Sequence, residues 1–424
     1  MTVGSLRFVP RSTEFTLLEQ KGEMGEHIVD YTIPQPAHVP DRPATLHASV
    51  DTIIQRILGE ICPDVVHING WKDSFALACH ERGVPCVITI HHGGVICPGG
   101  ALLDWEGKIC QRPIVDHVCG DCCVRALPGG SLVRLLAHPI PISVKRDLDS
   151  ISASVPQIPV VSAALRMYTA PARLRASLQA FRLPGTLIIS PSKSIAEALI
   201  RNGISQTQIT VLHHGVETYR RTPIVEGLGK RPLRLIYVGR INPVKGLHVL
   251  LRAISNITPS STWQLDIVGQ PVTKKEHRYH RKLLAQGSLL PVSWHGQKTH
   301  EEVGQLIAQS DVLVLPSICL EAFGLVVPEA LSTGRPVIAT RCGGPEEIID
   351  HGINGLLVEP GNSKDLEDAI RNLVINPHKV SEMSDAIQPV QDMESHVTLL
   401  LAIYYSAMAM RPTSRRSTEP VPHV

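Results

Sequence analysis

Two cations follow a candidate strand in the second half of the chain. The apolar run Leu233–Val238 leads into Gly239, Arg240 and Lys245, and an apolar helical pattern begins directly after them. Open parallel sheets bind ligands at the carboxyl ends of their strands, and a helix N-terminus at that edge favours anions. Gly239 would let the backbone turn tightly and approach a ligand. The segment therefore suits a diphosphate, although two solvated cations on a loop would give the same pattern.

Two carboxylates lie eight residues apart after a later strand. Glu321 precedes the apolar helix start at Phe323 and Gly324, and Glu329 lies about two turns into that helix. Burying a carboxylate among apolar residues is costly unless it is paired. A carboxylate accepts two hydrogen bonds at once, which suits the vicinal hydroxyls of a sugar. The backbone amides at the helix start would face a phosphate. For Glu329, a surface-facing position on the helix is the alternative.

The elements that must position these residues follow a regular order. From about residue 60, short apolar runs alternate with helical windows, which predicts two α/β domains with parallel sheets covered on both faces. A polar, Gly-rich gap places the boundary between a first domain, 1–217, and a second domain, 218–390. A helix over 391–410 and a disordered tail over 411–424 are expected to follow. The predicted strands are Asp64–Ile68, Cys86–Ile90, Thr186–Ser190, Ile209–His213, Leu233–Val238, Gln264–Val268, Asp311–Leu315 and Pro336–Ala339.

The composition is that of an ordinary globular protein. Of 424 residues, 43% are hydrophobic and 19% are charged, which excludes collagen-like, disordered and coiled-coil classes. Lys plus Arg number 41 against 39 for Asp plus Glu, and only 4% of residues are aromatic, so no nucleic-acid partner is expected. No apolar run approaches the ~20 residues of a membrane span, and no signal pattern opens the chain. We expect a cytoplasmic protein.

Taken together, these segments resemble the retaining glycosyltransferases of family four (glycosyl transferases group 1), which have the GT-B fold. The Gly-Arg-x4-Lys-Gly run at 239–246 and the Glu-x7-Glu run at 321–329 stand in the family's order. The segments 342–348 and 355–361 resemble its last strand–loop–helix units, and Thr89-Ile-His91 resembles its strand ending in Thr-x-His. The resemblance implies two Rossmann-like domains facing each other across a cleft, with the last helix crossing back to the first domain.

On the donor side, the resemblance implies a role for each matching residue. Arg240 and Lys245 would hold the donor's diphosphate and stabilise the charge that grows on it as the glycosidic bond breaks. Glu321, with the backbone at Phe323 and Gly324, would contact the donor sugar. Glu329 would bind the nucleotide ribose.

The first domain would supply the opposite side of the cleft. His91 matches the family's histidine that reaches the donor sugar from across the cleft, so we expect it to be catalytic together with Arg240, Lys245 and Glu321. His92 occupies a position that is often acidic, and either histidine could instead be an ordinary loop residue. Asn69 and Trp71 lie where acceptor-side loops are usually found.

The implied reaction transfers a sugar from a nucleotide diphosphate sugar to a hydroxyl of a glycan or lipid-linked acceptor, with retained configuration. It would need no metal or other cofactor, because Arg and Lys replace a cation at the diphosphate. A sugar-nucleotide 2-epimerase and a catalytically impaired binding or scaffold protein are the alternatives. The second is supported by Met1–Gln20, which shows neither the family's opening strand nor its Gly-rich loop, so the loop is replaced or the chain truncated.

Five cysteines gather in the segment 94–125, which interrupts the alternation of strands and helices. Four thiolates can hold a structural zinc ion in a tetrahedron, whereas free or redox-labile thiols, and less readily disulfides, are the alternatives. The segment looks like that of a cysteine-rich branch of these transferases, where a zinc ion would shape the acceptor-side lid without performing the chemistry. The cysteines are Cys97, Cys110, Cys119 and Cys122, which are the candidate zinc ligands, and the adjacent Cys123.

A basic surplus follows this segment. From Arg125 to Lys193 there are nine cations and two anions. Such a surplus favours peripheral contact with an anionic membrane, at its inner face, or with a lipid-diphosphate acceptor. A solvated cationic face is the alternative.

Overall fold

The computed structural model describes most of the chain as two compact units, Met1–Cys62 and Pro63–Val424. The tail expected to be disordered, 411–424, lies outside the described residues. The domain boundary predicted at 217–218 falls inside the second unit and stays a prediction. The described residues are 2–10, 16–21, 27–35, 44–125, 141, 144, 159–217, 219, 221–224 and 227–410.

The first unit contains a three-stranded sheet and a helix. Strands β1 (Thr2–Pro10), β2 (Thr16–Lys21) and β3 (His27–Gln35) pair in the order β1-β3-β2, with β1 parallel and β2 antiparallel to β3, and helix α1 (Ala44–Ile61) follows. The expectation of no strand within Met1–Gln20 is wrong in this respect. Its apolar residues are spread among polar ones and lack the continuous run by which the other strands were recognised.

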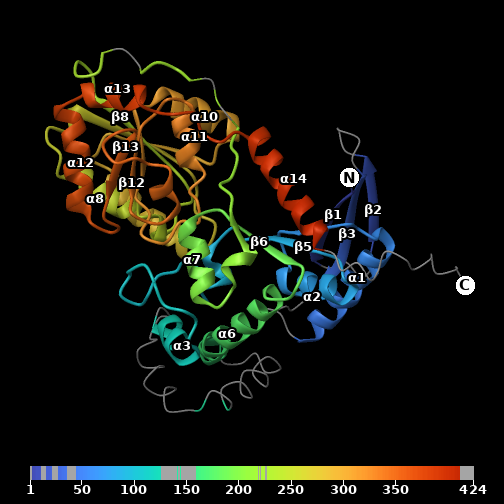
Figure 1. The fold of residues 1–424 in the computed structure, drawn as a ribbon. Coiled ribbons are helices and arrows are strands. Elements are labelled where there is room, and N and C mark those ends of the chain that lie inside the picture. The colour runs from blue at the N-terminus through green and yellow to red at the C-terminus, as the bar shows by residue number, and fades with distance from the viewer. Residues whose placement is uncertain are drawn as a thin grey trace, which may run out of the picture. The chain divides into compact units, whose positions relative to one another are not determined.

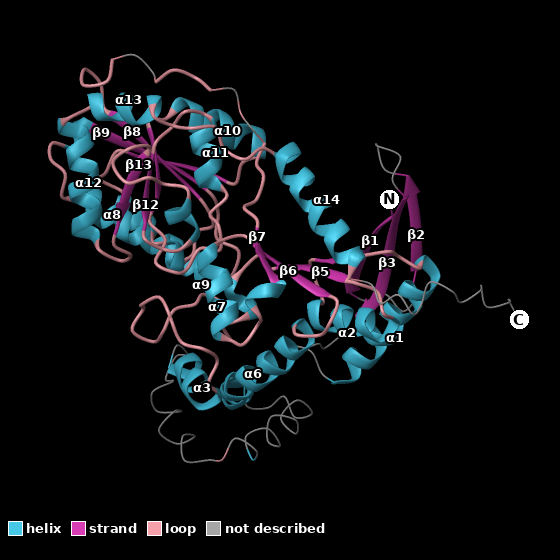
Figure 2. Cartoon of the chain, in the orientation of Figure 1, coloured by secondary structure: helices cyan, strands magenta, loops and turns pink. Residues whose placement is uncertain are grey.

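The second unit contains two sheets in which all paired strands are parallel (Figures 1 and 2). Their orders are β4-β5-β6-β7 and β10-β9-β8-β11-β12-β13. Every strand predicted after residue 60 is present, with ends shifted by a few residues. Strand β10 was missed because its residues are only partly buried, as expected at a sheet edge. The strands are β4 (Val66–Ile68), β5 (Cys86–Thr89), β6 (Thr186–Ser190), β7 (Ile209–Val211), β8 (Leu233–Val238), β9 (Trp263–Val268), β10 (Val292–Gly296), β11 (Val312–Leu315), β12 (Val337–Thr340) and β13 (Gly355–Val358).

Helices cover these sheets, and their starts follow the capping rules. Thr299 and Glu302 form a capping box at the start of one helix, and the Asn362 side chain caps another. The region 94–185, in which few elements were predicted, holds a long helix that continues through Pro171. The helices are α2 (Lys72–Arg82), α3 (Asp116–Arg125), α6 (Pro159–Phe181), α7 (Lys193–Arg201), α8 (Leu247–Ser255), α9 (Lys274–Gly287), α10 (His300–Gln309), α11 (Val326–Ser332), α12 (Ser363–Ile375), α13 (His378–Asp385) and α14 (Met393–Ala409).

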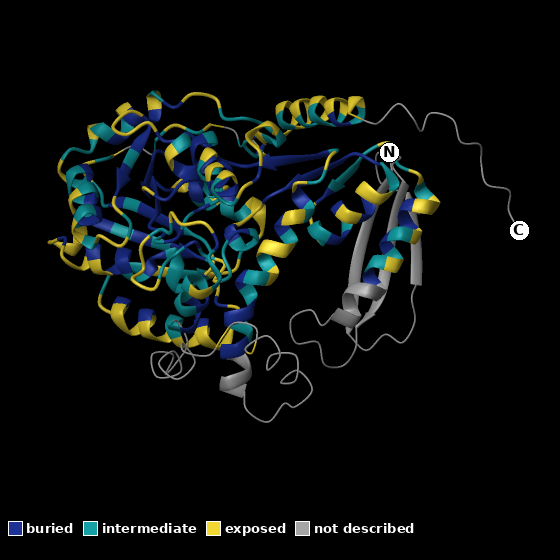
Figure 3. Cartoon of the chain, turned by 60° about the horizontal axis from the view of Figure 1, so that its bottom comes forward, coloured by how far each residue is buried: buried dark blue, intermediate teal, exposed yellow. Residues whose placement is uncertain are grey.

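The inner strands of the larger sheet, such as β11 and β12, are buried on both faces (Figure 3). On β8, Leu235 belongs to the cluster that includes residues of α8 and α12, whereas its neighbour Ile236 packs with Val327 of α11 and Ile307 of α10. Successive side chains of a strand point to opposite faces, so a strand covered on both sides must be apolar throughout. This burial holds the strands in place. It thereby also sets the positions of the loops that follow their carboxyl ends.

Helix α14 returns to the smaller sheet, as the resemblance implied. Ala407 is buried against Val87, Leu187 and Ile189, and Tyr404 packs at the side of this cluster. In the described part of the chain, no helix combines the length and the apolar content that a membrane crossing requires.

One hydrogen-bonded histidine joins α14 to two strands of this sheet. His67 of β4 contacts the Tyr404 hydroxyl through Nδ1 at 2.6 Å and the Thr89 hydroxyl of β5 through Nε2 at 2.7 Å. Burial, followed by the nearby His91, Lys72 and His396, lowers the pKa of His67 from 6.5 to about 4. The imidazole is therefore neutral in the folded protein at pH values where the unfolded chain takes up a proton.

We expect His67→Gln to reduce the loss of stability on acidification. The pKa of His67 is lower in the folded protein than in the unfolded chain. Its contribution to the free energy of unfolding is therefore complete above pH 6.5 and is lost as the pH falls toward 4. Between pH 7 and pH 5 this loss amounts to about 2 kcal/mol. Urea unfolding at both pH values should show a smaller difference in the variant than in the wild type. The exposed His277→Gln serves as the control, and equal differences in all three proteins would contradict the assignment.

Candidate active site

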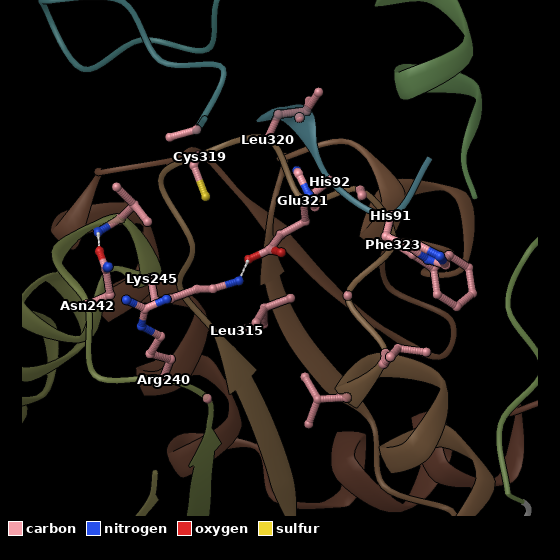
Figure 4. Close-up of a pocket in the computed structure, with 18 of the residues that line it drawn as sticks. His91, His92, Arg240, Asn242, Lys245, Leu315, Cys319, Leu320, Glu321 and Phe323 are labelled. Atoms are coloured by element: carbon pink, nitrogen blue, oxygen red, sulfur yellow. Dashed lines mark hydrogen bonds and ion pairs between the residues drawn. The ribbon is translucent and has the colours of Figure 1, made fainter. Parts of the chain in front are cut away.

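An open cavity of about 820 Å³ lies within the second unit, lined from the loops of both parallel sheets (Figure 4). Its polar residues follow the carboxyl ends of β5, β7, β8 and β11, which is the edge where parallel sheets bind ligands. The cavity brings together most of the predicted site. The predicted residues that line it are His91, His92, Gly239, Arg240, Lys245, Glu321, Phe323 and Gly324.

Three predicted residues do not line this cavity. Asn69 is hydrogen-bonded to His91, and Trp71 directly precedes helix α2. Trp71 has φ 50°, a left-handed conformation that is rare for a bulky residue. Glu329 is half-buried on α11, where burial raises its pKa, with Glu217 adding to the effect. Its expected role at the ribose stays a prediction.

The loop after β8 is held in one conformation by close packing. Gly246 has φ 71°, and a Cβ atom there would lie 1.7 Å from the Pro316 carbonyl oxygen, so only glycine fits. The backbone also passes closely beside Gly239, because a Cβ at Gly269 would lie 2.0 Å from the Gly239 oxygen. The approach of Gly239 to a ligand stays a prediction. Lys245 immediately precedes Gly246, and the tight passage beside Pro316 therefore fixes where its side chain begins.

The two central charged groups of the cavity contact each other. The Lys245 ammonium lies 2.6 Å from Glu321 Oε1, and the Ser317 hydroxyl donates to the same oxygen at 2.5 Å. The Glu321 side chain is only 11% exposed. Burial alone would lower the pKa of Lys245, but its contact with Glu321 outweighs burial and raises it. Lys245 is therefore charged at neutral pH and neutralises a buried carboxylate.

The second cation is paired as well. Arg240 Nη2 lies 2.7 Å from Glu276 Oε1, while half of the Arg240 side chain remains exposed at the cavity. Glu276 was missed in the sequence because it lies on α9, far along the chain from Arg240. The signal that could have found it is the capping box Thr273-x-x-Glu276.

Histidines form the opposite side of the cavity. His91 Nε2 lies 2.8 Å from Asn69 Oδ1, so the neutral ring donates from Nε2 and keeps a lone pair on Nδ1. Its ring stacks on His214 at 5.6 Å between centroids, and His214 meets the Phe323 ring edge-on at 5.4 Å. Burial is the main cause that lowers the pKa of His91 and lowers that of His214 to about 4. Both rings are therefore neutral at neutral pH.

His214 was also missed in the sequence. It follows β7 just as His91 follows β5, so the rule that selected residues at strand ends would have selected it too. His92 is oriented differently from His91, because its Nδ1 accepts the Gly94 N–H at 3.0 Å and caps a short helical turn.

The cysteine segment 94–125 reaches the cavity through Gly99, Gly100 and Ala101. Its five cysteines do not line the cavity. All ten cysteines are free thiols, so the disulfide alternative is wrong. Among the described residues, no group of three or more His, Cys, Asp or Glu side chains is arranged to hold a metal ion. The zinc site at Cys97, Cys110, Cys119 and Cys122 stays a prediction. Burial raises the pKa of Cys122 to about 11 and of Cys123 to about 12.

Comparison with known proteins agrees with this geometry. Residues 220–388 match the family model of glycosyl transferases group 1. This part of the chain is a glycosyl transferases group 1 domain. The chain is 32% identical over 211 residues to D-inositol 3-phosphate glycosyltransferase of Pseudarthrobacter chlorophenolicus, covering 47% of this chain and 50% of that protein. It is 26% identical over 216 residues to lipopolysaccharide 1,2-N-acetylglucosaminetransferase of Salmonella typhimurium, covering 47% and 56%. The chain spans about half the length of the curated relatives it matches.

Solved structures share the fold over most of the chain. Anabaena Alr3699/HepE in complex with UDP has a TM-score of 0.61 at 18% identity, covering 89% of this chain and 86% of that one. Sucrose-phosphate synthase from Thermosynechococcus elongatus has a TM-score of 0.61 at 18% identity, covering 96% and 89%. The predicted GT-B fold, with its two parallel sheets, is confirmed.

We expect Lys245→Ala to destabilise the protein by about 1–3 kcal/mol, because the buried Glu321 carboxylate then loses its cationic hydrogen-bond donor. Adding Glu321→Gln should restore part of this loss, since the uncompensated charge is then removed. Urea unfolding of both single variants and the double variant measures the coupling. Lys282→Ala, at an exposed position of α9, controls for loss of a lysine. Strictly additive effects would show that the contact does not contribute.

Proposed function

We propose that this protein transfers a sugar from a nucleotide diphosphate sugar to a hydroxyl of a glycan or lipid-linked acceptor, with retained configuration. The observation that carries the proposal is the cavity in which Arg240, Lys245 and Glu321 at one sheet edge face His91 at another. Residues 218–390 would bind the donor and residues 1–217 the acceptor.

The donor's diphosphate would lie against Arg240 and Lys245. A guanidinium offers two parallel donors to phosphate oxygens, and an ammonium acts as a point charge beside them. When the glycosidic bond breaks, negative charge grows on the leaving phosphate, and fixed cations stabilise that charge without a metal ion. Because Lys245 already contacts Glu321, a diphosphate bound there would place the adjoining sugar within reach of the Glu321 carboxylate.

His91 would hydrogen-bond the donor sugar from the other side. A neutral imidazole held at Nε2 by Asn69 presents an acceptor lone pair to a sugar hydroxyl. No side-chain nucleophile is proposed, because the leaving phosphate can accept the proton of the acceptor hydroxyl. Catalysis would then rest on positioning and electrostatics.

Acceptor contacts are proposed at Asn69, Trp71 and His92, which lie on or beside the loops that follow β4 and β5. A peripheral contact between Arg125–Lys193 and an anionic membrane or a lipid-diphosphate acceptor is proposed from charge alone. Much of that range, 126–140 and 145–158, lies outside the described residues.

A donor should stabilise the wild type and largely fail to stabilise Lys245→Ala. A ligand present at 100 times its Kd adds about 2.7 kcal/mol to the free energy of unfolding. Thermal unfolding with a panel of UDP-, GDP- and ADP-sugars measures this, with Lys282→Ala as the matched control. Product analysis then separates transfer to an acceptor from epimerisation of the donor. Equal stabilisation of Lys245→Ala and wild type by every donor would contradict the proposed site.

Replacing His91 by Ala should reduce transfer about 10²- to 10³-fold, because one oriented hydrogen bond to the reacting sugar is lost. Binding of the nucleoside diphosphate alone should change less than threefold, since Arg240 and Lys245 remain. Initial rates and equilibrium titration of the same preparation provide both values. Unchanged transfer would remove His91 from the mechanism.

A further inference from the structure

Glu276 is a buried carboxylate outside the lining of the cavity, and it receives more hydrogen bonds than its place on a helix requires. It is the third residue of α9, and its side chain is 3% exposed. Burial alone would raise its pKa, but the N–H groups of Thr273 and Val272, with Arg240 and Asn242, lower the pKa to about 2. The carboxylate is therefore charged at every pH at which the protein would work.

Its two oxygen atoms serve different partners. Oε2 accepts the backbone N–H groups of Thr273 at 2.8 Å and Val272 at 2.9 Å, and these bonds cap the helix. Oε1 accepts the Asn242 amide at 2.5 Å and lies 2.7 Å from Arg240 Nη2. Arg240 and Asn242 both line the cavity. One oxygen thus fixes the helix, and the other fixes the loop that would bind the diphosphate.

Helix capping accounts for the contacts of Glu276 Oε2 but not for those of Oε1. Helix α10 begins with the same motif, in which Glu302 Oε2 accepts the Thr299 N–H at 2.9 Å. The other oxygen of Glu302 contacts Lys298 at 3.0 Å, and neither residue lines the cavity. Two capping boxes of the same Thr-x-x-Glu motif therefore differ in what the second carboxylate oxygen holds.

The contacts of Glu276 reach both cations of the loop. Arg240 is held directly, and in the described part of the chain its ion pair is with Glu276. Asn242 accepts the Val244 N–H at 3.1 Å and so caps the short turn that ends at Lys245. Holding flexible cationic side chains and their loop before a ligand arrives lowers the entropy lost on binding.

We propose that Glu276 is a positioning residue for the diphosphate end of the donor, acting through Arg240 and Asn242. The inference rests on the proposed function. It assigns to a helix-capping carboxylate a second task, which is to arrange the cations of the cavity.

The test compares Glu276→Gln with Glu302→Gln by titration of UDP, GDP and ADP against the folded protein. Both variants weaken one capping box, and Glu276→Gln should lose more thermal stability because its carboxylate is buried and holds more partners. Both are therefore titrated well below their unfolding temperatures. The nucleoside diphosphate that binds the wild type should bind Glu276→Gln about 3- to 30-fold more weakly and Glu302→Gln within twofold of the wild type. In the Arg240→Ala background, Glu276→Gln should weaken binding less than it does alone.

Asn242→Ser provides a second route, in case Glu276→Gln fails to fold. Serine can still accept the Val244 N–H, and the helix cap on α9 is untouched, but the donor to Glu276 is gone. Its binding should be weakened in the same direction, with a raised KM and a smaller change in kcat. Unchanged binding in both Glu276→Gln and Asn242→Ser would overturn the inference.

Lys245→Ala distinguishes this inference from the proposed function. If Lys245→Ala weakens binding while Glu276→Gln behaves like Glu302→Gln, only the positioning role of Glu276 is refuted. If none of the three nucleoside diphosphates binds the wild type, or if Lys245→Ala binds them as the wild type does, the proposed function falls and this inference with it.

Discussion

The Lys245–Glu321 contact is the interaction around which the cavity is organised. A carboxylate that is 11% exposed needs a compensating cation, and Lys245 supplies it from a different strand end. Gly246 makes this possible, because no side chain fits beside the Pro316 carbonyl oxygen. A donor's phosphate and sugar would contact these same two groups. When the loop folds, it therefore also places the two side chains that would bind the donor.

One further carboxylate, Glu276, pairs with the other cation of the cavity in the same way. Glu276 holds Arg240 from α9, much as Glu321 holds Lys245. Each cation is neutralised before any ligand binds, so the cavity does not present isolated positive charges to solvent. On the opposite side, the stacked neutral rings of His91 and His214 add polar contacts without adding charge. An anionic donor would thus bind between the paired cations on one side and the neutral histidine rings, which can accept hydrogen bonds, on the other.

Sequence patterns predicted the parts of the molecule that obey simple rules. Strands such as Val312–Leu315 are covered on both faces and must be apolar, so their positions were predictable. Arg240, Lys245 and Glu321 were found because they follow such strands. The capping box of Glu276 marks its position in the sequence, but its contact with Arg240 joins distant segments and no spacing reveals it. His214 follows β7 and could have been found by the strand-end rule. The strand Thr2–Pro10 and the long helix through Pro171 lack the patterns that identified the other elements.

The central claim is that Arg240 and Lys245 grip a diphosphate beside Glu321. A crystal structure of this protein grown with a nucleoside diphosphate tests it most directly. The diphosphate oxygens should lie about 2.7–3.2 Å from the Arg240 guanidinium and the Lys245 ammonium, within the cavity that His91 lines. A nucleotide bound elsewhere on the molecule, with both cations still in their present contacts and the cavity empty of phosphate, would contradict the claim.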